Sequence, residues 1–275
     1  MKNQIFVFAL GATLALFTAC KKESSVTTFE ESIATSQELT AQQDEVQSND
    51  DEITYQVDER GGGDNDCPTR TWAQPKGTYP NTLTIDFGTT GCVGKDGKTR
   101  KGQLVVTFAG GDVRTVSGAT RTVTHANHSV DEVKVEGTKT LTNNGLNANG
   151  QPSFSRVVDN HKLTFPDGKF SQWSSAQTLT MTNGYATPLI RLDDVFAVNG
   201  ASNGTNRNGK TFATTTLTPL VKKATCSWFV SGSKQLTLNG DKTITINYGD
   251  GSCNRVATLT LPNGTTKEVN VKRWW

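Results

Sequence analysis

The stretch Gln235-Leu236-Thr237-Leu238-Asn239-Gly240-Asp241-Lys242-Thr243-Ile244-Thr245-Ile246 decides the fold class of this chain. Apolar residues alternate with Gln or Thr on both sides of Asn239-Gly240, and this alternation predicts strands that bury one face. Asn-Gly accepts the positive φ angles that a tight hairpin turn needs at both central positions. The stretch therefore predicts an antiparallel β-hairpin.

The same pattern recurs along residues 67–275. Eleven Asn-Gly or Asp-Gly dipeptides fall between segments that alternate or nearly alternate, such as 103–108, 215–218 and 256–261. Nothing long enough has a period of 3.6 residues. We therefore expect an all-β domain, built as an antiparallel β-sandwich or a barrel-like stack of about a dozen short strands.

An internal repeat gives further evidence on architecture. The run TIDFGTTGC at 84–92 returns as TINYGDGSC at 245–253, and a cysteine lies upstream of each run, at Cys67 and Cys226. We predict two related units, about 67–117 and 226–275, at the two ends of the domain. The segment 118–225 between them is either an insertion or a set of diverged copies.

The first twenty residues carry an export pattern. Met1-Lys2-Asn3 gives a cationic start, residues 5–17 are uncharged, and Thr18-Ala19-Cys20 gives a small-residue exit. The run is shorter than the roughly 20 apolar residues that span a bilayer. The alternatives are an ordinary signal peptide cut after Ala19, with Cys20 a spare thiol, and a signal that ends in lipidation.

The pattern resembles that of bacterial lipoproteins, whose peptidase cleaves before a cysteine that carries a diacylglyceryl group. This resemblance implies a signal peptide over 1–19, lipid attachment at Cys20 and a membrane anchor. Residue 21 is Lys rather than the Asp of inner-membrane retention, so the resemblance favours the outer membrane of the cell envelope, on its periplasmic or its surface face.

Charge divides the rest of the chain in two. Residues 21–66 hold thirteen Asp or Glu against three Lys or Arg, a net of −10, and residues 67–275 hold 24 Lys or Arg against 13 Asp or Glu, a net of +11. We interpret 20–66 as an acidic flexible tether that keeps the domain clear of the membrane. The alternative is an acidic arm that covers a basic surface until something displaces it.

Four cysteines remain after Cys20, an even number for an exported chain in an oxidising compartment. The repeat selects one of the three possible pairings, Cys67 with Cys92 and Cys226 with Cys253. A structural zinc site is the alternative, but no two of these cysteines have the close spacing of such sites.

Candidate ligand contacts are few. The basic residues Lys98, Arg100 and Lys101 could meet a glycan or another polyanion, with nucleic acid a weaker candidate, and Trp274 and Trp275 could stack on a sugar. The favoured interpretation, however, is that basic residues on strands keep sheet edges from aggregating and that the terminal aromatics pack under the sheet.

The sequence contains few residue patterns that are typical of a catalytic site. There is no Gly-x-Ser-x-Gly and no glycine loop between a strand and a helix, and we expect no cofactor. His125 and His128 lie three apart, which in a strand predicts opposite faces and hence no metal site. Asp86 has Asn247 as its repeat partner, so this position needs a short hydrogen-bonding side chain rather than an acid.

Residues 67–275 are similar to a Bacteroidota family of all-β envelope lipoproteins through the phrases at 85–92, 97–102, 208–212 and 248–253. This resemblance implies no particular activity. We expect a noncatalytic, membrane-anchored envelope lipoprotein that presents a β-rich binding or interaction module. The alternatives are a purely structural envelope protein and a glycan-active or other hydrolytic enzyme, which needs two carboxylates facing one groove.

Overall fold

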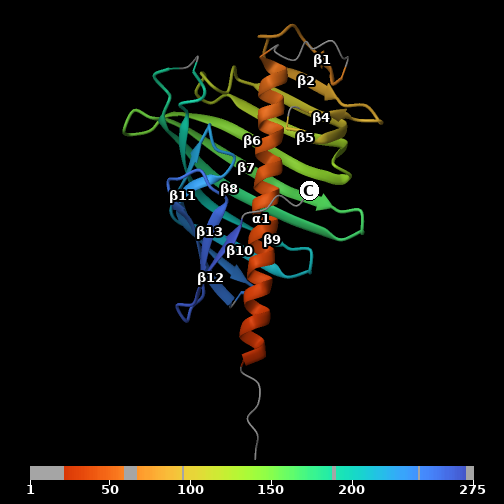
Figure 1. Cartoon of the computed structure of the whole chain (residues 1–275). Coiled ribbons are helices and arrows are strands. Elements are labelled where there is room, and N and C mark those ends of the chain that lie inside the picture. The colour runs from red at the N-terminus through yellow and green to blue at the C-terminus, as the bar shows by residue number, and fades with distance from the viewer. Residues whose placement is uncertain (1–21, 59–66, 95, 188–189, 241, 271–275) are drawn as a thin grey trace, which may run out of the picture.

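In the computed structural model, the described residues are 22–58, 67–94, 96–187, 190–240 and 242–270. They form one α-helix and a single antiparallel sheet of 14 strands (Figure 1). The prediction of an all-β, antiparallel domain is confirmed. The strands belong to one sheet, however, and not to the two packed sheets of a sandwich.

The sheet is a meander in which almost every strand pairs with its neighbours in the chain. The strand order is β1-β2-β4-β5-β6-β7-β8-β9-β10-β11-β12-β13-β14, and β3 pairs with β4 outside this path. The strands are β1 (Thr69–Trp72), β2 (Asn81–Asp86), β3 (Cys92–Val93), β4 (Thr99–Ala109), β5 (Thr120–Val130), β6 (Val133–Leu146), β7 (Pro152–Thr164), β8 (Phe170–Asn183), β9 (Val195–Thr205), β10 (Thr211–Lys223), β11 (Phe229–Leu238), β12 (Lys242–Asp250), β13 (Val256–Thr260) and β14 (Thr266–Asn270). Several are longer than predicted, with 14 residues each in β6 and β8.

The helix α1 (Lys22–Val57) crosses the inner face of the sheet and accounts for 36 residues of the acidic segment (Figure 1). No glycine or proline interrupts this stretch, and side-chain hydrogen bonds four residues apart support it, from Gln47 to Asp51 and from Gln56 to Glu52. The prediction of a flexible tether is therefore wrong for residues 22–57.

One stripe of α1 is buried against the sheet, and its members follow one another at intervals of three or four residues. The stripe consists of Ser32, Thr35, Leu39, Gln42, Val46, Asn49, Ile53 and Gln56. Only three of these eight side chains are apolar, so the stripe does not form the continuous apolar face that normally identifies a packed helix. The polar members find their partners on the sheet.

The core lies between α1 and the inward-facing residues of the strands. Near the C-terminal end of α1, Ile53 packs in one cluster with Leu83, Ile85 and Leu104. Towards the middle of the helix, Leu39 and Val46 belong to a second cluster whose other members come from β7–β14. The helix is thus shared by both halves of the sheet, and neither cluster is complete without it.

β-Bulges change which residues face the helix. The register shifts between Lys101 and Gln103 in β4, and between Thr124 and Ser129 in β5. Asn127 has a φ of 50° in this irregularity, and Gly102 opposite has a φ of 71°, where a Cβ would lie 2.1 Å from the carbonyl oxygen of Asn127. A bulge inserts one extra residue into a strand, so the residues after it point to the opposite face from the one that simple alternation predicts.

As a result His125 and His128 lie on the same face, with ring centroids 5.5 Å apart. The prediction that a spacing of three would separate them is wrong, because simple alternation does not hold across a bulge.

Both predicted disulfides are present. Cys67–Cys92 and Cys226–Cys253 have Cα–Cα distances of 5.8 Å and 5.7 Å. Each bond joins a residue just before a hairpin to a residue after it, around β1–β2 in the first case and β11–β12 in the second.

The repeat extends to a shared turn. The Asp86 side chain accepts a hydrogen bond from the backbone N–H of Gly88 at 2.8 Å, and Asn247 accepts the equivalent bond from Gly249 at 2.9 Å. The short side chain of Asp86 therefore acts as a hydrogen-bond acceptor in this turn, as its repeat partner Asn247 indicated. Residues 1–21, which include the predicted signal peptide and Cys20, lie outside the described residues, as do Trp274 and Trp275.

Candidate functional site

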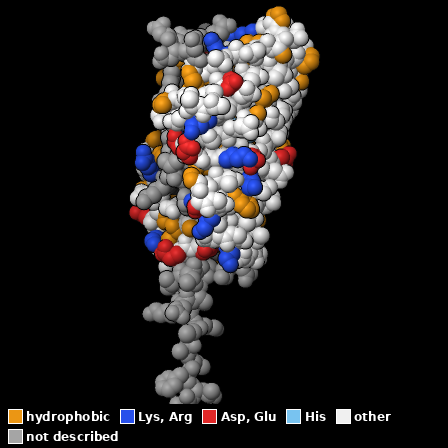
Figure 2. Space-filling model, turned by 90° about the vertical axis from the view of Figure 1, so that its right-hand side faces the viewer, with side chains coloured by type: hydrophobic (Ala, Val, Ile, Leu, Met, Phe, Trp, Pro, Cys, Tyr) orange, Lys and Arg blue, Asp and Glu red, His pale blue; other side chains and the backbone are white. Residues whose placement is uncertain are grey.

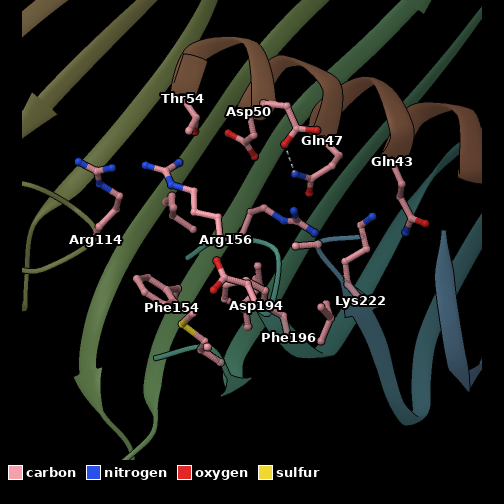
Figure 3. Close-up of a pocket in the computed structure, with 18 of the residues that line it drawn as sticks. Gln43, Gln47, Asp50, Thr54, Arg114, Phe154, Arg156, Asp194, Phe196 and Lys222 are labelled. Atoms are coloured by element: carbon pink, nitrogen blue, oxygen red, sulfur yellow. Dashed lines mark hydrogen bonds between the residues drawn. The ribbon is translucent and has the colours of Figure 1, made fainter. Parts of the chain in front are cut away.

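A large cavity lies between one side of α1 and the sheet (Figure 3). Its volume is about 890 Å³, within the range of about 300–1,000 Å³ that small-molecule sites occupy. Its walls come from segments far apart in sequence, which the meander and the helix bring together.

The helix wall of the cavity is polar. Its α1 residues are Thr40, Gln43, Gln47, Asp50, Asp51 and Thr54. All but Asp51 follow one another at intervals of three or four residues, so they form a second stripe next to the buried one. Figure 3 shows Gln43, Gln47 and Asp50 projecting from the helix into the space below it. α1 thus uses one stripe to pack against the sheet and a neighbouring stripe to line the cavity.

The sheet wall is largely apolar. Strands β7, β8, β9, β11 and β12 contribute its apolar side chains: Phe154, Leu179, Met181, Phe196, Val198, Phe229 and Tyr248. Two aromatic pairs brace this wall, Phe154 with Phe196 at 6.5 Å and Phe229 with Tyr248 at 5.5 Å between ring centroids. Edge-on contacts are a favoured arrangement of aromatic rings, so both pairs help to stabilise this wall.

Asp50 is the main ion-pair centre between α1 and the sheet. Its Oδ1 lies 2.5 Å from the Nζ of Lys139 on β6 and also accepts a hydrogen bond from Arg121 on β5. Burial opposes ionisation of this carboxyl, but the two neighbouring cations hold its pKa below the usual range. Asp50 is therefore ionised, and both of its ion pairs with the sheet are made through Oδ1.

Arg156 on β7 is different, because its partner is neutral. Its Nε and Nη2 donate hydrogen bonds to the amide oxygen Oε1 of Gln177 on β8, at 3.1 Å and 2.6 Å. Among the described residues, no carboxylate forms an ion pair with it. The side chain is 9% exposed, and burial lowers its pKa, an effect that Asp50 opposes. A buried cation in a cavity wall is an unusual arrangement.

A histidine cluster lies deeper under α1. His161 Nε2 lies 2.6 Å from Glu45 Oε2, and both side chains are almost fully buried. Trp173 donates its Nε1–H to His161 Nδ1 at 3.0 Å, so the proton shared with Glu45 is on Nε2. Burial opposes ionisation of Glu45, but His161 lowers the pKa of this carboxyl to about 2.

His125 and His128 complete the cluster. The His125 ring lies 6.1 Å from that of His161, and its Nε2 is 3.4 Å from Asn49 Nδ2 on α1. Burial, with a smaller contribution from His125, lowers the pKa of His128 to about 3. Over the described ranges, no group of three or more His, Cys, Asp or Glu side chains is arranged to hold a metal ion.

The basic residues predicted to contact a ligand do not form one exposed patch. Arg100 is buried, and its guanidinium donates to both carboxylate oxygens of Asp96 and to Ser48 of α1. Lys98 is also buried, while Lys101 pairs with Glu132 at 2.6 Å. On the side of the molecule in Figure 2, Lys and Arg are scattered among Asp and Glu over a mostly uncharged surface.

Sequence reasoning missed both the cavity and Arg156. The available signal was local: Phe154, Arg156 and Val158 share one face of β7 by alternation, so an arginine occupies an inward position between two buried apolar residues. The helix wall gave no such signal, because its role depends on the folding of an acidic segment onto the sheet.

Comparisons of this chain with protein-family models, with curated proteins and with solved structures gave no match.

The pKa of His128 predicts an acid-linked loss of stability. The folded state resists protonation of this ring down to about pH 3, whereas the unfolded chain accepts the proton near the ordinary histidine pKa of 6.5. Stability present above pH 6.5 is therefore lost as the pH falls towards 3, by up to about 1.4 kcal/mol per pH unit per proton. His128→Phe should make the free energy of unfolding less dependent on pH over this window, as measured by urea unfolding. Identical slopes for the two proteins would contradict the prediction.

Proposed function

We propose that this protein is a noncatalytic lipoprotein of the bacterial cell envelope, held on the outer membrane by acyl chains on Cys20, and that it binds a small molecule between α1 and the sheet. The observation that carries the binding role is the cavity of about 890 Å³ with a polar helix wall and a largely apolar sheet wall. A concave, mostly apolar site with a few convergent polar groups is the usual form of a ligand pocket.

Two observations support the location. The first twenty residues resemble a lipoprotein signal that ends at Cys20. The two disulfides indicate a compartment outside the cytoplasm. Within the described residues, α1 lacks the combination of length and apolar character that a membrane-crossing helix needs. An anchor at Cys20 would precede the start of α1 by only two residues, so the binding module would lie close to the membrane.

Two alternatives are weaker. A purely structural protein has no use for a large cavity with a buried cation. A hydrolytic enzyme needs paired carboxylates in one groove, and Asp51 and Asp194 both line the cavity with pKa values raised chiefly by burial. Hydrolysis is therefore the second candidate function. If the protein is a hydrolase, Asp194→Asn should abolish turnover but not the binding of a ligand.

The anchor is tested by Cys20→Ala. Without the thiol no diacylglyceryl group can be attached, so the variant should accumulate as unprocessed precursor or appear in the soluble fraction. The measurement is fractionation of cells together with metabolic labelling by an alkyne-bearing fatty acid. Membrane attachment and label unchanged in the variant would rule out lipidation at this residue.

The binding role is tested by filling the cavity. Gln43 points into it from α1 (Figure 3), so Gln43→Trp should displace a bound molecule. Native mass spectrometry of protein isolated from its own membranes should show a small-molecule adduct on the wild type and little or none on this variant.

Gln37→Trp is the matched control, because Gln37 belongs to the same helix but does not line the cavity. An adduct that both variants retain equally would place the ligand elsewhere, and a wild type without any adduct would contradict the binding role.

A further inference from the structure

We infer that the cavity takes an anionic amphiphile, with its hydrocarbon chain on the sheet wall and its carboxylate or phosphate head group bound by Arg156. This inference rests on the proposed binding function and names the class of ligand. It follows from three features of the cavity: an excess of positive charge, a buried arginine with a neutral partner, and the apolar character of the wall next to that arginine.

The charges around the cavity do not balance. The lining holds six Lys or Arg (Lys76, Arg114, Arg121, Arg156, Arg191 and Lys222) and four Asp (Asp50, Asp51, Asp58 and Asp194). Asp50 pairs with Arg121 and with Lys139 behind the wall, and Asp58 pairs with Arg114 and Arg191. The lining therefore has a net charge of +2 on formal counting, which favours an anion.

Among the six cations of the lining, Arg156 is the buried one. Its hydrogen bonds in the described structure go to Gln177, a neutral amide that satisfies donors but cannot balance a charge. Removing a guanidinium from water without a counter-ion is costly. A ligand carboxylate or phosphate would supply this counter-ion, and the planar guanidinium is suited to hold two oxygens of such a head group at once.

The neighbours of Arg156 identify the rest of the ligand. Figure 3 shows Arg156 in the middle of the cavity, with Asp50 on the helix above it and Phe154 and Phe196 below. Leu179 and Met181 extend the same wall. Flexible aliphatic side chains beside two edge-on rings fit a hydrocarbon chain.

The polar helix wall fits the same orientation. Gln43, Gln47 and Thr54 offer neutral hydrogen-bonding groups opposite the apolar wall. The chain of the ligand therefore lies on the sheet, and the remaining polar atoms of its head group face α1.

The test uses full-length protein in phosphatidylcholine nanodiscs and isothermal titration with four probes that share one alkyl chain: dodecanoate, dodecyl phosphate, dodecyl maltoside and dodecyltrimethylammonium. Empty nanodiscs serve as the blank. We expect dodecanoate and dodecyl phosphate to bind at least about tenfold more tightly than the neutral and cationic probes, the size expected for charge-assisted hydrogen bonds. The ratio of the two anions distinguishes a carboxylate from a phosphate ligand.

Two variants test the role of Arg156. Arg156→Gln should weaken dodecanoate binding about ten- to a hundredfold. Gln177→Glu keeps the shape of the side chain and supplies a carboxylate of the protein's own next to Arg156, so it should weaken dodecanoate binding while raising the melting temperature of the unliganded protein. If Arg156→Gln does not fold, Gln177→Glu carries the test.

Lys162→Gln is the matched control, since Lys162 lies on the same strand, contacts Phe170 and does not line the cavity. It makes the same change in charge and should leave dodecanoate affinity unchanged.

Equal affinity for all four probes, or full affinity in Gln177→Glu, would overturn the ligand class and leave cavity binding intact. If no probe binds and the isolated protein carries no adduct, the proposed function itself fails.

Discussion

The burial of α1 against the inner face of the sheet is the interaction on which the rest of the structure depends. The helix carries acidic and amide side chains, and the sheet presents Lys139, Arg121 and His161 to them. Replacing such buried pairs by apolar residues is often neutral for stability, but removing one partner leaves an unpaired charge and costs about 3–5 kcal/mol. These pairs therefore fix the position of α1 more than they add to stability: sliding the helix by one turn would leave Glu45 and Asp50 buried without partners.

The unequal charge of the two parts of the chain follows from this arrangement. Nine of the thirteen Asp or Glu at 21–66 belong to α1, and those that pair with Lys139, Arg121 and His161 make this charge complementary to the sheet. This complementarity also explains why the basic domain shows no large basic patch in the view of Figure 2, because several of its cations face inward to α1. The same packing creates the cavity, since one side of the helix seals the core while the adjacent side stands off from the sheet.

The sequence was enough to predict those features that depend on local patterns. Alternation and Asn-Gly turns identified the strands, and the repeat identified both disulfides and the shared turn of Asp86 and Asn247. The features that it did not predict depend on contacts distant in sequence. The buried stripe of α1 has only Leu39, Val46 and Ile53 as apolar members, seven residues apart, and its polar members became a packing surface only through partners such as Ser171, which Gln42 contacts at 2.8 Å. His125 and His128 were assigned to opposite faces because a bulge has no signature in the alternation itself.

The most direct measurement for this account is hydrogen–deuterium exchange, followed by mass spectrometry of peptides from residues 30–57. If α1 is a buried part of the core, its amides should exchange as slowly as those of the central strands β6 to β8, because both open only with the main folding unit. If these residues formed a solvated acidic tether, their amides would exchange within seconds while the strands stayed protected, and that result would contradict the account.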